Sequence, residues 1–244
     1  MLRCLSCLAM VLSVLAAGCT KSTTPGKLHW VRSDSDQQRA GNVYLLRGWI
    51  GIFSSGIDDL TRKINQAGVR AHVYQDDQWS QLAERLRKTY RPNPNHEPLV
   101  LIGHSYGADD VVRVARELGK DNIAVDLLIT LDPVTPPRIP ANVKWCVNIY
   151  RPNGAWDKMP WLRGIRVKAD SPAATQLANY NIRVDRTDLL EDDTDHFNIE
   201  KNRKIHAEVV KLVLQACPPR AQWVAARAAG AAHVPPGNLR IADK

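Results

Sequence analysis

The fold of this chain is decided by the stretch Pro98-Leu99-Val100-Leu101-Ile102-Gly103-His104-Ser105-Tyr106-Gly107. Residues 98–102 form an apolar run that predicts a buried strand, and the periodicity of residues 108–118 predicts a helix. Between them, residues 103–107 carry the pattern Gly-x-Ser-x-Gly, which in a strand–turn–helix context raises a serine hydroxyl above the end of a sheet. The two glycines permit the tight backbone that such a turn needs. Ser105 is therefore a candidate nucleophile, and the alternative is a chance turn without chemistry.

Outward from this stretch, expected strands alternate with expected helices along the chain. The expected strands are 42–46, 69–73, 98–102, 123–131, 143–150 and 176–184, and the expected helices are 55–67, 79–90, 108–118 and 201–216. Such alternation predicts a mostly parallel sheet with helices on both faces. Sites in these sheets lie at the carboxyl ends of the strands, where Ser105, Asp132 and residues 47–50 fall.

The amino-terminal segment has the pattern of an export signal. Arg3 supplies a positive start, and residues 5–17 are apolar but too short for a membrane span. The run Leu15-Ala16-Ala17-Gly18-Cys19 resembles the lipobox of bacterial lipoproteins, with Ala16 where leucine is more frequent. The resemblance implies cleavage before Cys19 and attachment of lipid to that residue. The alternative is an ordinary secretory signal with a coincidental cysteine.

The expected domain organisation follows from these segments. Residues 1–18 are the signal peptide, 19–40 the lipidated cysteine and a tether, 41–218 one domain, and 219–244 a loosely ordered tail. Several acyl chains together anchor a protein firmly to a bilayer. Thr20, in place of the aspartate that marks inner-membrane retention, favours the outer membrane. We therefore expect a protein of the bacterial cell envelope that faces the periplasm.

Composition narrows the range of partners. The formal net charge is +8, but the basic residues are scattered, with no run and no interleaved aromatic side chains. This pattern is typical of a solvated surface beside anionic lipid headgroups, and it argues against nucleic acid as a partner. No Cys pair or His pair has metal-ligand spacing. We expect a monomer with no metal and no cofactor.

Two cysteines, Cys146 and Cys217, remain in the expected domain. An exported compartment permits a disulfide between them. Two buried thiols that behave as small apolar side chains are the alternative. The sequence supplies no distance that decides between the two.

The alternating elements and the Gly-x-Ser-x-Gly turn together resemble the α/β-hydrolase superfamily, over roughly residues 42–217. The resemblance implies a three-layer α/β-hydrolase-like fold with trimmed N-terminal strands, similar in size to cutinase-like and small lipase-like members. It implies a serine hydrolase that cleaves carboxylic ester or thioester bonds through an acyl-enzyme. An acyltransferase or amidase on the same triad, or a catalytically silent binding module, are the alternatives.

A serine hydroxyl needs an adjacent base, and the base needs an orienting acid. In this family the order along the chain is Ser, acid, His. His196, in the loop before the last helix, lies where the family has its histidine. Asp132, at the end of strand 123–131, matches the position used by pancreatic-lipase-like members. Asp157, after the next strand, occupies the more frequent position and stays as the alternative acid.

Acyl transfer also needs donors for the developing oxyanion. By the family's pattern, one is the backbone N–H of Tyr106. The run Arg47-Gly48-Trp49 resembles the family's His-Gly-x, with Arg in place of His, and makes the N–H of Trp49 the second donor. Ile50 is the alternative donor, because the sequence does not fix which of the two adjacent N–H groups faces the oxyanion.

The expected substrate is a small-molecule or lipid ester. Its acyl length and leaving group are left open. An apolar cluster follows strand 143–150 and comprises Trp156, Met159, Trp161 and Leu162. This cluster either forms an acyl-binding wall or belongs to the core.

Overall fold

The computed structural model describes residues 25–48, 55–154, 158–159 and 163–230. Within these residues, six strands form one sheet in the order β2-β1-β3-β4-β5-β6, and every neighbouring pair is parallel. The strands are β1 (Asn42–Leu46), β2 (Arg70–Tyr74), β3 (Leu99–His104), β4 (Val125–Leu131), β5 (Val143–Tyr150) and β6 (Gln176–Asn181). The α-helices are α2 (Ser55–Gln66), α3 (Trp79–Tyr90), α4 (Tyr106–Gly119), α5 (Arg203–Ala216) and α6 (Arg220–Ala228).

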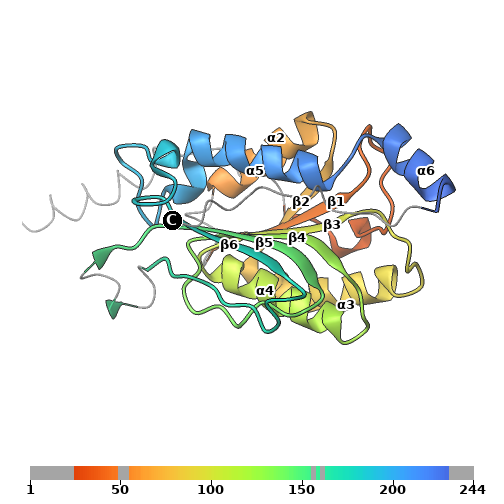
Figure 1. Cartoon of the computed structure of the whole chain (residues 1–244), viewed down its shortest axis with the longest axis horizontal. Coiled ribbons are helices and arrows are strands. Elements are labelled where there is room, and N and C mark those ends of the chain that lie inside the picture. The colour runs from red at the N-terminus through yellow and green to blue at the C-terminus, as the bar shows by residue number, and fades with distance from the viewer. Residues whose placement is uncertain (1–24, 49–54, 155–157, 160–162, 231–244) are drawn as a thin grey trace, which may run out of the picture.

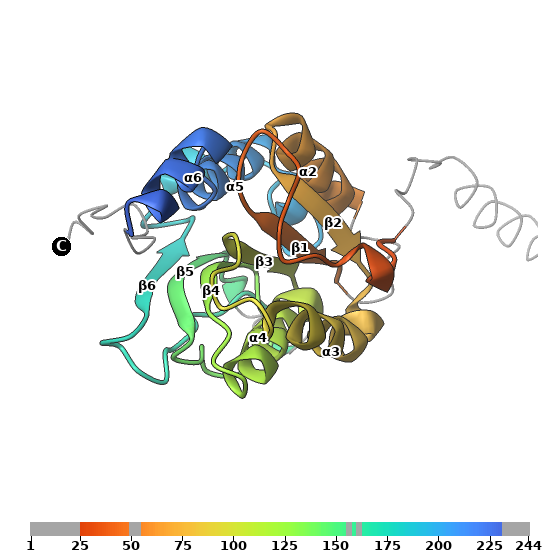
Figure 2. The same ribbon diagram turned by 90° about the vertical axis from the view of Figure 1, so that its right-hand side faces the viewer.

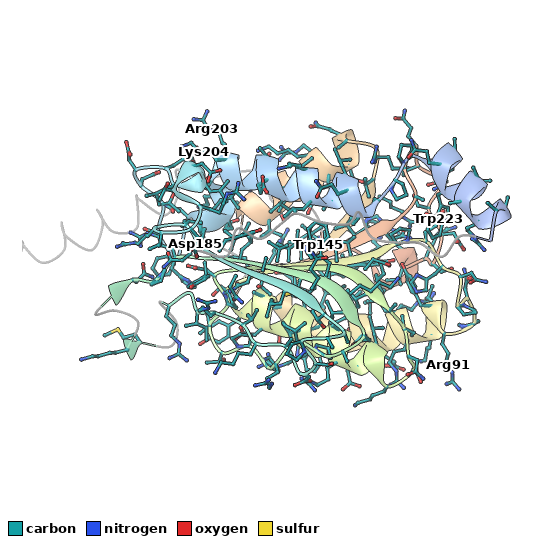
Figure 3. The ribbon with its side chains drawn as sticks, in the orientation of Figure 1. Arg91, Trp145, Asp185, Arg203, Lys204 and Trp223 are labelled. Carbon is teal, nitrogen blue, oxygen red and sulfur yellow. The ribbon has the colours of Figure 1, made fainter. Side chains whose placement is uncertain are left out.

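Three layers make up the molecule. Helices α2 and α5 cover one face of the sheet, and α3 and α4 cover the other (Figure 1 and Figure 2). Successive side chains of a strand point to opposite faces, so Val43 and Leu45 pack under α2 and α5 while Tyr44 and Leu46 pack against α3 and α4. Trp145 of β5 lies on the α2/α5 side (Figure 3). The predicted fold class, a mostly parallel sheet with helices on both faces, is confirmed (Figure 1).

The strand order reverses direction between β1 and β3. From β1 the chain first adds β2 on one side, and β3 then starts the other half of the sheet. In open parallel sheets, the carboxyl ends of the strands at such a reversal form a crevice in which sites are built. Arg47 follows β1 and Ser105 follows β3, so both lie at this crevice.

Both predicted ends of the domain differ from the structure. Residues 25–40, expected to belong to a tether, pack on the sheet: Val31 and Ala40 are buried, and the N–H of Gly26 donates to the carbonyl of Val73 at 2.6 Å. Residues 220–228, expected to be a loosely ordered tail, form helix α6, whose Trp223 is buried (Figure 3).

The physical reason for both differences is one buried carboxylate, Glu97. It accepts hydrogen bonds from the N–H groups of Ser35 and Gly41 at 2.9 and 2.8 Å. It also accepts one from Nη1 of Arg220 at 2.6 Å. A buried charge is stable only when it is paired and hydrogen-bonded, and here the partners come from both ends of the chain. The folded unit therefore extends beyond 41–218 in both directions.

Cys146 and Cys217 are both buried and not bonded to each other. Cys146 belongs to the core layer beside α3 and α4, and Cys217 to the layer beside α2 and α5. Since the sheet separates them, the disulfide is not formed, and the alternative of two buried thiols holds. No helix among the described residues is long and apolar enough to cross a membrane.

Candidate active site

The turn after β3 holds Ser105 in an unusual backbone conformation, with φ 55° and ψ −124°. Close packing on both sides enforces the turn. A side chain at Gly103 would overlap the carbonyl oxygen of Gly107, and one at Gly107 would overlap that of Arg47. Strained conformations of this kind persist only where the surrounding structure over-determines them, and they concentrate at functional sites. Ser105 is therefore presented at the carboxyl edge of the sheet, with helix α4 starting directly behind it.

Three of the predicted site residues, Ser105, His196 and Asp132, meet at this edge. The Oγ atom of Ser105 lies 3.0 Å from Nε2 of His196. Nδ1 of His196 lies 2.9 Å from Oδ2 of Asp132. Their exposed fractions are only 7%, 3% and 0%. The contacts join residues that are 91 and 64 positions apart in the sequence.

The hydrogen bonds fix the proton on the histidine ring. An ionised carboxylate only accepts hydrogen bonds, so Nδ1 of His196 carries the hydrogen that points to Asp132. Nε2 is then an acceptor and faces the hydroxyl of Ser105. This is the arrangement in which an imidazole can take a proton from a serine.

Asp132 is held by β5, the strand next to β4, and by the residue that follows β5. It follows β4, has a positive φ of 50°, and donates its N–H to the carbonyl of Ile149 at 2.9 Å. Its Oδ1 accepts the N–H of Arg151 at 2.6 Å. A side chain at Gly164 would overlap this carboxylate, which explains why a glycine is needed there. The sequence offered no signal for Gly164, because the contact joins two loops that are distant along the chain.

Asp109 is a further buried acid beside the site. Its carboxylate accepts the N–H groups of Val134 and Thr135 at 3.0 and 2.8 Å, and so ties the loop after Asp132 to helix α4. Burial raises the pKa of Asp109 to about 6. Sequence reasoning missed this role, because an acid in the first turn of a helix is common for reasons of helix electrostatics alone.

Arg47 and Asp58 form a buried ion pair between the end of β1 and helix α2. Nε and Nη2 of Arg47 each lie 2.9 Å from one oxygen of Asp58, and both side chains are almost fully buried. A bidentate pair of this kind fixes both position and orientation. Arg47 thus anchors the chain at the point where it leaves β1. Nothing in the sequence paired these two residues.

Glu200 connects the segment after His196 with helix α2. Its Oε2 accepts the N–H of Ile57 at 2.7 Å, at the amino end of that helix. The side chain is fully buried, and burial raises the pKa of its carboxyl to about 8. His206 is also buried and lies against Glu200, with Nε2 2.6 Å from the carbonyl oxygen of that residue.

Several predicted residues lie outside the part of the chain that the structure describes. These are the lipidation residue Cys19, the oxyanion donor Trp49 with its rival Ile50, the alternative acid Asp157, and Trp156, Trp161 and Leu162. Tyr106 is described, and it is the first residue of α4. Of the apolar cluster, Met159 is described and is 39% exposed. Phe197, 51% exposed, stands edge-on to the ring of His196 at 5.7 Å.

The described residues contain no group of three or more His, Cys, Asp or Glu side chains arranged to hold a metal ion. The groups that meet at this site are suited to nucleophilic catalysis. A serine, a base within hydrogen-bond distance and an acid behind the base are the parts of covalent acyl transfer.

Comparisons with known proteins find no matching family model and no matching curated protein. Among solved structures, the chain is similar to a cutinase-like protein from Cryptococcus sp. (TM-score 0.44, 15% identity, covering 72% of this chain and 94% of that one). It is also similar to Aspergillus fumigatus lipase B (0.45, 12%, 80% and 57%). A third is YbtT, a type II thioesterase from the yersiniabactin biosynthetic pathway (0.39, 12%, 72% and 94%). At such low identities and TM-scores, these similarities do not identify the reaction that the site catalyses.

Proposed function

We propose that this protein is a serine hydrolase that cleaves carboxylic ester or thioester bonds through an acyl-enzyme, anchored to the bacterial envelope by lipid on Cys19. The observation that carries the hydrolase proposal is the continuous chain of hydrogen bonds from Ser105 through His196 to Asp132, with distances of 3.0 and 2.9 Å. A structural role for three buried polar groups would not require the serine at the end of this chain to sit on a strained turn. That conformation is costly, and it turns the hydroxyl toward the histidine.

In the proposed reaction, the Oγ atom of Ser105 forms a bond to the acyl carbon while Nε2 of His196 takes the serine proton. The bond from the acyl carbon to the leaving oxygen or sulfur then breaks, and His196 returns the proton to the leaving group. Water attacks the acyl-serine by the same route and releases the acid. Asp132 stays ionised throughout, orients the ring and stabilises the imidazolium that forms transiently.

The oxyanion of each tetrahedral intermediate needs donors on the side of the serine away from the histidine. We assign one to the N–H of Tyr106, since the first N–H groups of a helix point out of its amino end. The second comes from the loop after β1, where Trp49 is the proposed donor. The buried Arg47–Asp58 pair supports this assignment, because it fixes the chain immediately before that loop.

The hydrolase proposal is tested with a panel of p-nitrophenyl esters and acyl thioesters of graded chain length. The wild type is expected to turn over part of the panel, whereas Ser105→Ala is expected to lose at least about 10⁴-fold in kcat. Turnover that is equal in both proteins contradicts the proposal. Amide substrates and alcohol acceptors in the same panel reveal an amidase or acyltransferase on the same triad.

The envelope part of the proposal has its own test. Radiolabelled palmitate is expected to enter the wild type and not Cys19→Ala, and the wild type is expected to fractionate with the outer membrane. Absence of label from the wild type would overturn the lipid anchor and leave the hydrolase proposal standing.

A further inference from the structure

The histidine inside the Gly-x-Ser-x-Gly turn has a contact that the reaction above does not use. Nε2 of His104 lies 3.0 Å from the main-chain carbonyl oxygen of His196. A carbonyl oxygen only accepts hydrogen bonds, so Nε2 of His104 carries the hydrogen and donates it. His104 is buried, with an exposed fraction of only 4%. The centroid of its ring lies 5.7 Å from that of the His196 ring.

From this contact we infer that His104 is a positioning residue for the histidine of the triad, an inference that rests on the proposed function. His104 is the last residue of β3 and is adjacent to Ser105 in the chain. One rigid segment therefore holds His196 at two points. Ser105 contacts its ring, and His104 contacts its backbone.

The loop that carries His196 needs such an anchor. Near His196, the hydrogen bonds from the N–H groups of Phe197 and Asn198 to the side chain of Asp195 stay inside the loop and set its shape rather than its place. Glu200, four residues after His196, ties the far end of the loop to helix α2. The bond from His104 ties the loop to the central strand of the sheet. Across the sheet, His104 pairs with Leu131, directly before Asp132, so the same strand neighbours all three triad residues.

The surroundings of His104 keep its ring neutral, so that it can donate the same hydrogen bond throughout the reaction. Burial is the main cause that lowers the pKa of His104 to about 3, and the positive charge that His196 can carry contributes to this shift. Lys201 acts in the same direction. A neutral imidazole beside His196 supplies a hydrogen bond without repelling the imidazolium form of that residue. A charged lysine or arginine at this position would disfavour it.

The distances decide how much such an anchor matters. Proton transfer needs the Oγ atom of Ser105 and Nε2 of His196 within hydrogen-bond distance, and a displacement of about 1 Å costs about 100-fold in rate. Loss of one backbone anchor is expected to leave the fold in place but to let the histidine loop shift. The expected consequence is a fall in kcat with little change in KM.

The chain offers a matched control for this experiment. His206 is buried to a similar degree, and its Nε2 likewise donates to a backbone carbonyl, that of Glu200, at 2.6 Å. It lies on α5 and touches no member of the triad. Loss of its hydrogen bond therefore measures what a buried histidine contributes to stability alone.

The experiment compares wild type, His104→Leu, His104→Gln and His206→Leu by thermal unfolding and by kcat and KM on the best ester of the panel. We expect His104→Leu to lose about 10- to 100-fold in kcat with KM changed by less than about twofold. His104→Gln, whose amide keeps a donor at similar reach, is expected to recover most of that loss. His206→Leu is expected to lose stability but keep kcat. Equal kcat in the two leucine variants, or no recovery with glutamine in a folded protein, would overturn the inference.

A second measurement separates this inference from the proposed function. The hydrogen bond from Nδ1 of His196 to Asp132 is expected to give a downfield NMR resonance that can be recorded without substrate. We expect it to be sharp in wild type and in His104→Gln and broadened in His104→Leu, and an unchanged resonance in His104→Leu overturns the inference even if no ester is cleaved. If the leucine variant does not fold, His104→Asn, whose amide ends short of the carbonyl, replaces it with the same expectations.

Discussion

Two buried carboxylates lie at opposite ends of the sheet, and they have different partners. Glu97 precedes β3 and accepts hydrogen bonds from the N–H groups of Ser35 and Gly41 and from Arg220. Asp132 follows β4 and accepts hydrogen bonds from the N–H of Arg151 and from His196. Both are almost fully excluded from water.

The difference lies in whether a partner can pass a proton on. The donors around Glu97 are backbone amides and a guanidinium, which keep their protons at any ordinary pH, so Glu97 can only hold the chain together. The imidazole beside Asp132 has a second ring nitrogen that can accept a proton, and this nitrogen faces a serine. Equal burial therefore serves architecture at one end of the sheet and, in our proposal, chemistry at the other.

The largest effect on turnover is expected from Asp132→Asn, which removes the charge of the carboxylate beside His196. The asparagine keeps an oxygen for the N–H of Arg151 but offers the wrong group to His196, whose ring then adopts the wrong tautomer. We expect kcat to fall about 10⁴-fold with the fold intact, as the same change does in a serine protease triad. Steady-state kinetics beside circular dichroism measure both. A much larger loss in Asp157→Asn than in Asp132→Asn would show that the acid has been misassigned.

The next largest effect is expected from Gly107→Ala, which disturbs the backbone packing directly behind Ser105. The added methyl group would overlap the carbonyl oxygen of Arg47, and the carbonyl of Leu46 lies only 2.6 Å away, so β1 and α4 have to separate. Overpacking of this kind costs about 3 kcal/mol. Chemical denaturation is expected to show that loss together with loss of turnover. Gly154→Ala is the control, since no atom of the described residues lies within 4 Å of its added carbon, although its positive φ of 65° adds a backbone strain of its own. Equal stability of the two variants would contradict the close packing behind Ser105.

The architectural carboxylate is tested by Glu97→Gln. Loss of the charge weakens hydrogen bonds to two amides and to Arg220, and bonds to a charged group contribute about 2 kcal/mol. We expect the free energy of unfolding to fall by that amount while kcat stays at the wild-type value. A fall in kcat larger than the loss of folded protein explains would mean that the two ends of the sheet are coupled.

A further prediction concerns pH and Glu200. Its pKa in the folded protein is raised from 4.5 to about 8 by burial, so the folded state binds a proton that the unfolded state has already released. Stability from this group is therefore complete below about pH 4.5 and is lost as the pH rises to about 8. Glu200→Gln is expected to flatten the fall in unfolding temperature across that window, whereas the exposed Glu84→Gln is not. A wild-type slope that persists in Glu200→Gln would contradict this assignment.

Local patterns were enough to predict the core elements. The strand expected at 143–150 is β5 to the residue, because a mostly apolar run bounded by turn residues leaves little choice of ends. The helix expected from 201 begins at Arg203 instead, since Ile199–Lys201 forms a 3-10 turn and Asn202 caps the helix by accepting the N–H of Ile205. Asn202 was a visible capping signal in the sequence that the periodicity alone did not use.

What the sequence did not supply are contacts between distant segments. Ser105 and His196 were predicted as partners from a family pattern, but Glu97 with Arg220, and Arg47 with Asp58, follow no local rule. Each pair joins a loop to a helix that only the folded chain brings near. The ends of the folded unit were misplaced for the same reason, because residues 25–40 and α6 carry little apolar periodicity of their own.

Covalent labelling with a fluorophosphonate, mapped by peptide mass spectrometry, tests the central claim most directly. The account predicts one phosphonyl group on the peptide that contains Ser105 in wild type, slow labelling in His196→Ala, and none in Ser105→Ala. Labelling of folded wild type at another residue, or no labelling at all, would contradict the assignment of Ser105 as a nucleophile activated by His196.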